Sequence, residues 1–289
     1  MDSPYPESSL IKTNGRRFFL FSLFLVIGIF LLTNPVTAAT TSLHIEKLAT
    51  DGKTLLSSKD VEFAWMEANL PVYGDGVTHY YHQGPVFVDN PDQAREESLR
   101  WNPAEDTNVQ EKDMGAVKGT AVKDLTDLIG GMEPGDTVTI RASDGFTKTF
   151  AYQNVYQPPD RQGPMVITWY RDDEGYVPDF RTGMRLIFFA DTSTNPWGIH
   201  AFGNWDWHES ADPEYYYYYI QGGEQYPTTT GLSVQQVSEI IIHENPDSST
   251  TEQASATTIP LPPITGITAV LILAAAGAGM KRVHGSEKR

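Results

Sequence analysis

Cysteine is absent from the 289-residue chain. A chain without thiols forms no disulfide, and it offers neither thiolate ligands for zinc or an iron–sulfur cluster nor a cysteine nucleophile. Because paired cysteines are what mark an oxidising compartment, their absence leaves the redox state of the surroundings unreadable. A metal site in this chain would therefore depend mainly on histidine nitrogen and carboxylate oxygen.

Positive charge is also scarce. The chain has 21 Lys and Arg against 37 Asp and Glu, a formal net charge of −16. Phosphate neutralisation needs clustered Lys and Arg, and the central region has no such cluster, so we expect no nucleic-acid partner. An acidic surface keeps a protein soluble, and it also attracts cations or suits high-salt surroundings.

Local catalytic motifs are missing as well. The sequence contains no nucleophile elbow, phosphate-binding loop, dinucleotide fingerprint, His-Glu-x-x-His pair or EF-hand loop. It also has no Asn-x-Ser/Thr glycosylation acceptor, since Asn195 is followed by Pro196. No reaction class can therefore be assigned from a motif.

An apolar run lies near each end of the chain. Arg16 and Arg17 precede an uncharged run over 18–32 and the small residues before Ala39. This pattern predicts a secretory signal peptide over 1–38, with an uncleaved anchor as the alternative. Arg16 to Leu20 resembles the twin-arginine pattern only in part, and strong hydrophobicity favours the general secretory route.

The second apolar run, 264–280, is uncharged and is followed by Lys281 and Arg282. A Ser/Thr/Pro-rich stretch over 246–263 precedes it. We expect a stalk, a transmembrane anchor and a cytoplasmic basic tail over 281–289, because positive residues stay on the cytoplasmic side. This arrangement predicts a cell-membrane protein whose bulk is extracellular; the alternative is a sorting signal that is removed.

Residues 39–245 carry the pattern of a single extracytoplasmic domain. Strand-like alternation is found at 42–49 and 137–143, and Asp-Gly turns follow both segments. Apolar residues at helical spacing begin at Val122 and stop at Gly130-Gly131. Further strands are expected at 164–173, 183–191 and 240–243. The order predicts an α+β, mainly β domain.

Several of these segments resemble sulfite-oxidase-type molybdopterin-binding domains. The residues that carry the likeness are "MGAVKGTAVKDLTDLIGGMEPGDTVTIRASDGFTKTFAYQNV" (114–155), "MVITWYRDDEGYVPDFRTGMRLIFFAD" (165–191), "YPTTTGLSVQQVSEIIIH" (226–243) and "VEFAWMEANLP" (61–71). The resemblance implies one such domain with an aromatic-rich insertion near 191–225. The stretches "EANLPVYGDGVTHYYHQGP" and "FGNWDWHE" are similar to surface proteins of methanogenic archaea that carry such a domain.

The resemblance also implies a limit to the shared chemistry. In that family the strand after the early helix ends in a cysteine that binds molybdenum, and the corresponding stretch here, "THYYHQGP" (78–85), has none. Imidazole does not replace a soft thiolate at an oxotransferase centre. We therefore expect no molybdenum cofactor, and whether another cofactor is bound stays open.

Histidines near aromatic residues are the candidate site. His79, His82, His200 and His208 are possible metal ligands, although His79 and His82 share a face only if the stretch is helical. The alternatives are ordinary structural histidines or a polar pocket or ligand surface; that surface would comprise Tyr80, Tyr81, Trp205, Asp206, Trp207 and Glu209. The run Tyr215 to Tyr219 is expected to alternate between inward and exposed rings if it is extended.

Two functions are compatible with these patterns. The first is a non-catalytic, membrane-anchored cell-surface module that serves either binding, with a glycan or an envelope component as its partner, or the architecture of the envelope. The second is an extracytoplasmic oxidoreductase that holds a pterin or a His-ligated metal. The missing thiolate favours the first, so the protein is more readily interpreted as a binding protein than as an enzyme.

Overall fold

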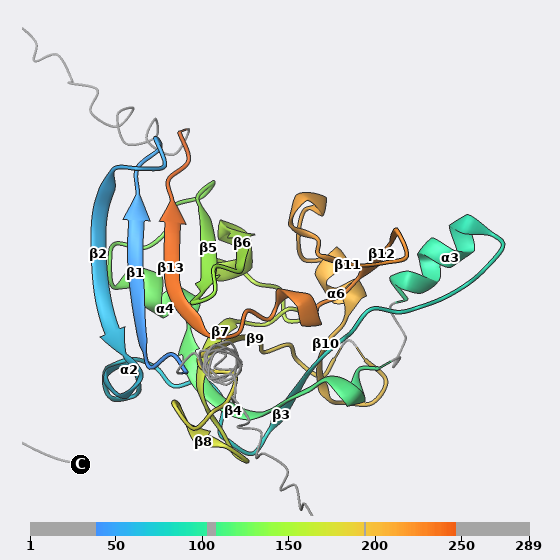
Figure 1. Cartoon of the computed structure of the whole chain (residues 1–289), viewed down its shortest axis with the longest axis horizontal. Coiled ribbons are helices and arrows are strands. Elements are labelled where there is room, and N and C mark those ends of the chain that lie inside the picture. Colours follow the sequence, from blue (N-terminus) through green and yellow to red (C-terminus); the bar gives the residue numbers. More distant parts are fainter. Residues whose placement is uncertain (1–38, 103–107, 194, 247–289) are drawn as a thin grey trace, which may run out of the picture. The chain divides into compact units, whose positions relative to one another are not determined.

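The computed structural model describes residues 39–102, 108–193 and 195–246. The expected signal peptide, transmembrane span and basic tail lie outside these residues, as does all of the expected stalk except Pro246. Within the described ranges the chain forms two larger β-sheets and a separate two-stranded hairpin (Figure 1). This arrangement confirms the prediction of an α+β, mainly β fold.

The first sheet places the two ends of the described chain side by side. Its order is β2 (Leu55–Glu62), β1 (Ser42–Leu48), β13 (Val237–His243), β5 (Thr137–Ala142) and β6 (Thr147–Ala151). The first and last strands, β1 and β13, pair in parallel, whereas the other neighbours are antiparallel (Figure 1). The predicted strands at 42–49, 137–143 and 240–243 are therefore confirmed.

The second sheet contains the remaining predicted strands. Its order is β10 (His200–Phe202), β3 (His79–His82), β4 (Asp113–Ala121) and β7 (Met165–Arg171). The far edge of β7 pairs with both β8 (Gly175–Tyr176) and β9 (Arg185–Phe188). Alternation along β7 divides its side chains between the two faces of this sheet.

One hydrophobic core joins the two sheets. Ile45, Ile140 and Ile242 of the first sheet belong to the same buried cluster as Ile167 and Trp169 of β7. Burying each of these side chains contributes about 1.5–3 kcal/mol. A second, smaller cluster of buried residues lies mostly on strands of the second sheet. It comprises Tyr80, Met114, Val117, Val166, Ile187 and Phe189.

The helices of the described residues are short. They are α2 (Phe63–Asn69), α3 (Gln93–Arg100), α4 (Val122–Asp127), α5 (Tyr152–Tyr156) and α6 (Asn204–His208), with 3₁₀ turns at Gln110–Lys112, Pro213–Tyr215 and Thr230–Leu232. Helix α4 ends before Gly130 and Gly131, whose φ angles of 101° and 72° no other residue type adopts easily. The predicted helix stop is therefore confirmed.

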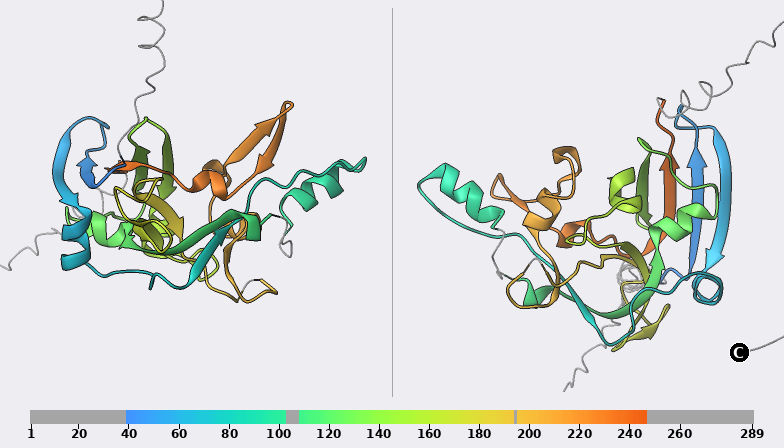
Figure 2. Two further views of the ribbon diagram at one scale, coloured as in Figure 1. Left: turned by 60° about the horizontal axis from the view of Figure 1, so that its bottom comes forward. Right: turned by 180° about the vertical axis from the view of Figure 1, so that it is seen from behind.

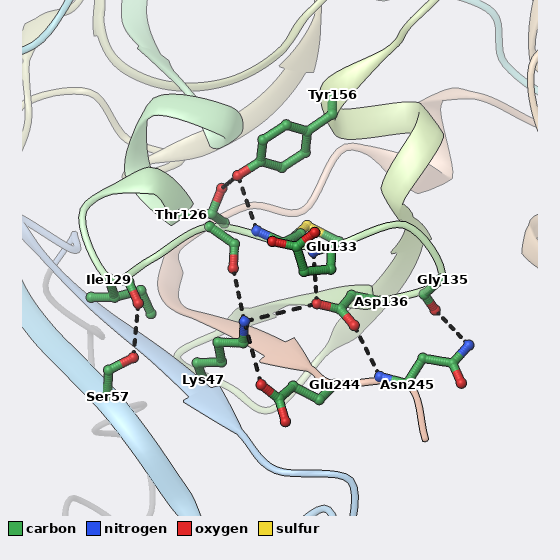
Figure 3. A network of polar contacts seen from close by, with 12 residues as sticks. Lys47, Ser57, Thr126, Ile129, Glu133, Gly135, Asp136, Tyr156, Glu244 and Asn245 are labelled. Atoms are coloured by element: carbon green, nitrogen blue, oxygen red, sulfur yellow. Dashed lines mark hydrogen bonds and ion pairs between the residues drawn. The ribbon is translucent and has the colours of Figure 1, made fainter. Parts of the chain in front are cut away.

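The turn between α4 and β5 is held against the first sheet by a polar network (Figure 3). Lys47 Nζ on β1 donates to the carbonyl of Gly131 at 3.2 Å. The carboxylate of Asp136 accepts from the backbone N–H groups of Glu133 and Asn245, each at 2.9 Å. These contacts satisfy a buried carboxylate, which would otherwise be costly to enclose.

The separate two-stranded hairpin and helix α3 lie beside each other in both views of Figure 2. The hairpin consists of β11 (Tyr218–Gln221) and β12 (Glu224–Pro227). Arg100, the last residue of α3, forms an ion pair with Glu224 of β12 at 3.2 Å. This contact joins the two elements.

The prediction of a transmembrane helix requires correction. Among the residues that the structure describes, no helix is long and apolar enough to cross a membrane. The apolar run that prompted the prediction, 264–280, falls outside the described ranges, and so does the run 18–32 of the expected signal peptide.

Candidate functional site

His79 and His82 lie on a β-strand and therefore point to opposite faces. His79 is exposed, and its Nδ1 lies 2.8 Å from a carboxylate oxygen of Asp113. His82 is fully buried between the rings of Phe188 and Phe202. The two imidazoles consequently cannot bind the same ion.

The His82 ring is uncharged in the folded protein. Its Nε2 accepts a hydrogen bond from the backbone N–H of Phe188 at 3.2 Å, which places the ring proton on Nδ1. Burial and the charge of Arg185 lower the pKa of His82 to about 3. This histidine is therefore part of the core rather than a proton carrier near neutral pH.

The next residue, Gln83, is buried and belongs to a network of hydrogen bonds. The Gln83 carbonyl accepts from the backbone N–H groups of Thr229 at 3.0 Å and Thr230 at 3.1 Å. Gln83 Oε1 accepts from the Asn204 N–H at 2.8 Å, and Asn204 Oδ1 accepts from the Thr229 N–H at 3.1 Å. The network connects β3, α6 and the segment after β12 through hydrogen bonds, so its role is structural.

His200 and Tyr80 pair across the β10–β3 ladder. His200 Nδ1 donates to the carbonyl of Ala190 at 2.7 Å. The Tyr80 ring is buried and stacks on Phe189 with 3.8 Å between ring centroids. Tyr81 points away from Tyr80 and is only half-buried. The rings of Tyr80 and His200 also contact each other, with centroids 5.1 Å apart, whereas Tyr81 lies on the other face of the strand.

Helix α6 divides its predicted site residues between core and surface. Trp207 is buried against Phe150, whereas Trp205 stacks on His208 with ring centroids 4.6 Å apart. Asp206 accepts from the Gly203 N–H at 2.8 Å and so fixes the first turn of the helix. Glu209 lies 3.1 Å from His208 Nδ1.

The predicted histidine ligands are thus in separate environments. Across the described ranges, no three His, Asp or Glu side chains are grouped in a way that could hold a metal ion. A zinc-type site needs three or four donors that converge at about 2 Å. The geometry of the described residues gives the four histidines individual roles instead.

Aromatic residues that were not predicted as site residues form a cluster beside α6, and its central residue, Trp101, is buried. The Trp101 ring contacts His208, Tyr216 and Tyr218, with centroid distances of 5.0, 5.0 and 6.1 Å. Tyr215 to Tyr218 are all half-buried and only Tyr219 is exposed, so the alternation that was expected for an extended run does not occur. The cause is the 3₁₀ turn at Pro213–Tyr215, after which the chain becomes a strand only at Tyr218.

Three further rings form a patch on the hairpin. Tyr219 and Tyr226 pair across β11 and β12, and Phe87 contacts them with centroid distances of 6.0 and 4.8 Å. Phe87 is 53% exposed and Tyr219 is 45% exposed. We call these three residues the hairpin patch. They come from segments more than 130 residues apart, which is why no sequence pattern revealed them.

An acidic cavity adjoins the hairpin patch. It has a volume of about 590 Å³ and is lined by Val88, Asp89, Gln93, Glu96, Glu97, Arg100, Glu224 and Tyr226. Arg100 is largely buried, and its guanidinium carbon lies 4.6 Å from the centroid of the Tyr226 ring. Its Nη2 donates to Glu96 at 2.6 Å and to Glu224 at 3.2 Å. Three of the four carboxylates that line the cavity, those of Glu96, Glu97 and Glu224, therefore form ion pairs with this guanidinium, at 2.6, 3.9 and 3.2 Å.

No protein-family model matches the chain, and comparison with curated proteins finds no match either.

Proposed function

We propose that the protein is a non-catalytic binding module, and that the hairpin patch and the acidic cavity beside it bind a basic, extended polypeptide segment of another protein. The observation that carries the proposal is the exposure of Phe87 and Tyr219 next to a cavity lined by Asp89, Glu96, Glu97 and Glu224. Aromatic rings and acidic side chains together suit a partner that presents both Lys or Arg and apolar groups.

The charges in the cavity favour a cationic partner. Arg100 is the only basic residue among those that line it, and this arginine already contacts Glu96, Glu224 and the Tyr226 ring. Glu97 lies 3.9 Å from Arg100 Nη1 and accepts from Trp101 Nε1 at 2.9 Å, but its side chain is 58% exposed. Its carboxylate and that of the exposed Asp89 can therefore still face a partner. The net charge of −16 would attract basic segments from a distance at low salt.

The backbone favours an extended partner. Within the described residues, β11 and β12 pair only with each other, so the outer edge of β11 has no neighbouring strand. A peptide strand can add to such an edge through main-chain hydrogen bonds, while alternate side chains meet the exposed rings. Tyr219 lies in this strand, so both kinds of contact would occur together.

The second candidate function, an oxidoreductase with a pterin or a His-ligated metal, has less support. A metal centre would need three or four converging donors, and in the described residues no three His, Asp or Glu side chains are grouped in a way that could hold a metal ion. Resemblance to molybdopterin-binding domains concerns the order of the elements, and a scaffold does not fix a function. We propose this second function only as the alternative to be tested by elemental analysis.

The binding proposal is tested with a fluorescent ten-residue peptide of alternating Lys and Val, added to the full-length chain. We expect saturable binding that weakens as salt is raised, and at least tenfold weaker binding by Phe87→Ala. Leu55→Ala, which removes a side chain of similar exposure (52%) from β2, is the matched control and should bind normally. Equal binding of an alternating Glu–Val peptide, or binding of maltohexaose instead, would contradict a basic polypeptide partner.

Metal analysis tests the alternative. The purified full-length chain is analysed for molybdenum, zinc, copper, nickel and iron, and for fluorescent pterin derivatives after oxidation. We expect none at stoichiometric level. A stoichiometric metal that is lost in His200→Ala or His208→Ala would favour the oxidoreductase over the binding module.

A further inference from the structure

A second cavity lies at the edge of the first sheet, where the chain before β11 passes over β6. Its volume is about 290 Å³, and it is lined by Thr147, Lys148, Thr149, Glu214, Tyr215, Tyr216 and Tyr217. Lys148 occupies the central position of the exposed half of β6, which is an edge strand. None of these residues belongs to the hairpin patch or to the acidic cavity.

The amine of Lys148 is surrounded by aromatic rings rather than by carboxylates. Its Nζ lies 3.6 Å from the centroid of the Tyr217 ring and 4.8 Å from that of Phe146. Within the described residues this Nζ has no hydrogen bond and no carboxylate within 4.0 Å, in contrast to Lys47 and Lys123, which are paired with acidic residues. Lys148 is thus a half-buried amine without a counterion.

This environment favours the neutral amine. Burial lowers the pKa of Lys148 to about 8, because the half-buried ammonium loses part of its water of hydration. At pH 7 roughly a tenth of such a group is unprotonated, far more than for a lysine of ordinary pKa. The acidic or phenolic groups that line the cavity are Glu214, Tyr215, Tyr216 and Tyr217. A desolvated lysine next to an open cavity has the properties of a nucleophile.

We infer that Lys148 is a covalent binding site for a small aldehyde or ketone, held in the cavity as a reversible imine. The nitrogen lone pair attacks the carbonyl carbon, and the carbonyl oxygen leaves as water with the two protons of the neutral amine. An amine and a carbonyl compound thus give an imine and water, and nothing is oxidised or reduced. Glu214, in the same cavity, is the carboxylate that can exchange these protons.

The cavity limits the ligand. Its volume corresponds to a molecule of roughly ten non-hydrogen atoms, since a water molecule occupies about 30 Å³ in the liquid. The rings of Tyr215 to Tyr217 supply much of the wall and favour a flat or aromatic carbonyl compound. Lys148 itself supplies the bond.

Trapping with benzaldehyde tests the inference on the full-length chain. Sodium cyanoborohydride donates hydride to the protonated imine and converts it to a stable secondary amine, which mass spectrometry of tryptic peptides locates. At pH 7 we expect Lys148 to be labelled at least tenfold faster than Lys59 and Lys118. These two are suitable references because they also lie near aromatic rings, at 4.5 Å from Trp65 and 5.0 Å from Tyr170.

Two variants keep the result interpretable. Lys148→Arg keeps the positive charge but cannot form an imine, so labelling of residue 148 should vanish while Lys59 and Lys118 react as before. Tyr217→Leu opens the aromatic wall and should reduce the selectivity for Lys148 by at least threefold, with circular dichroism as the check on folding. Labelling of Lys148 no faster than that of the two reference lysines would overturn the inference.

Discussion

The ammonium of Lys47 lies between two carboxylates, 4.0 Å from Asp136 Oδ2 and 3.5 Å from Glu244 Oε1. The Asp136 side chain is fully buried, and the Lys47 side chain is only 11% exposed. Lys47 comes from β1, the first strand of the described chain, and Glu244 directly follows the last. Charged side chains from the two ends of the described chain, Lys47 and Glu244, therefore pair beside the turn that precedes β5.

We predict that Asp136→Ala lowers the free energy of unfolding by about 2–4 kcal/mol. The change leaves two backbone N–H groups without their acceptor and removes one of the two carboxylates beside the nearly buried Lys47 ammonium. Chemical denaturation measures this change. Asp60→Ala removes an exposed carboxylate that pairs with His44 at 2.8 Å, and it should change stability by less than about 1 kcal/mol. Equal effects of the two variants would contradict the structural role of Asp136.

We predict that stability falls with acidification because His82 is buried in its neutral form. Its folded pKa of about 3 lies below the unfolded value of 6.5, so between these pH values the unfolded state binds the additional proton. The contribution is present above pH 6.5 and is lost as pH falls towards 3, at up to about 1.4 kcal/mol per pH unit.

Denaturation of His82→Phe over the same pH range isolates this contribution. The variant leaves the Phe188 N–H without its acceptor, so it should be about 1–3 kcal/mol less stable at pH 7. Its stability should fall less steeply between pH 6 and pH 4 than that of the wild-type protein. Parallel pH profiles would show that His82 is not responsible.

We predict that Gly231→Ala displaces the ring that lies over Lys148. A Cβ at residue 231 would be 1.9 Å from Cε1 of Tyr217, so either the ring or the backbone must move. Such overpacking costs about 1–3 kcal/mol. Thermal denaturation measures the loss. Gly52→Ala is not a suitable control, because Gly52 has a φ angle of 66° and a side chain there would strain the backbone. Gly203→Ala, whose Cβ would have 3.2 Å to its nearest neighbour, is the better comparison.

We predict that the carboxylates of the acidic cavity, and not only its rings, determine binding of the Lys–Val peptide. Glu97→Gln keeps the acceptor for Trp101 Nε1 but removes a charge, so affinity should fall several-fold and its salt dependence should become shallower. Asp173→Gln, on the turn after β7, removes a charge elsewhere and should leave affinity unchanged. Peptide titrations at 50 and 300 mM salt would expose the difference, and an unchanged salt slope would contradict the proposal.

Local patterns in the sequence were sufficient for α4 and for five of the strands, β1, β5, β7, β9 and β13. Alternation in Leu43, Ile45 and their neighbours, and the stop at Gly130-Gly131, depend on contacts close in the chain and on backbone conformation. His79 and His82 were correctly expected to diverge if they lay on a strand. The fold class follows from such local information.

The residues of the site could not be found in that way. Gln83 meets Thr229, 146 residues away, and Phe87 meets the hairpin rings across a similar separation. Trp205 and Trp207 are two residues apart, yet one stacks on His208 and the other lies in the core. Which aromatic residue is buried depends on tertiary packing that a single sequence does not specify.

The parallel pairing of β1 with β13 also bears on how the protein folds. β13 lies between β1 and β5, so the first sheet cannot be continuous until the strand that ends at His243 has been synthesised. Until then the β1–β2 and β5–β6 hairpins each have an unpaired, apolar edge, and closing a loop of nearly 200 residues is slow. A chain that ends before Val237 would therefore have two separate hairpins in place of the five-stranded sheet.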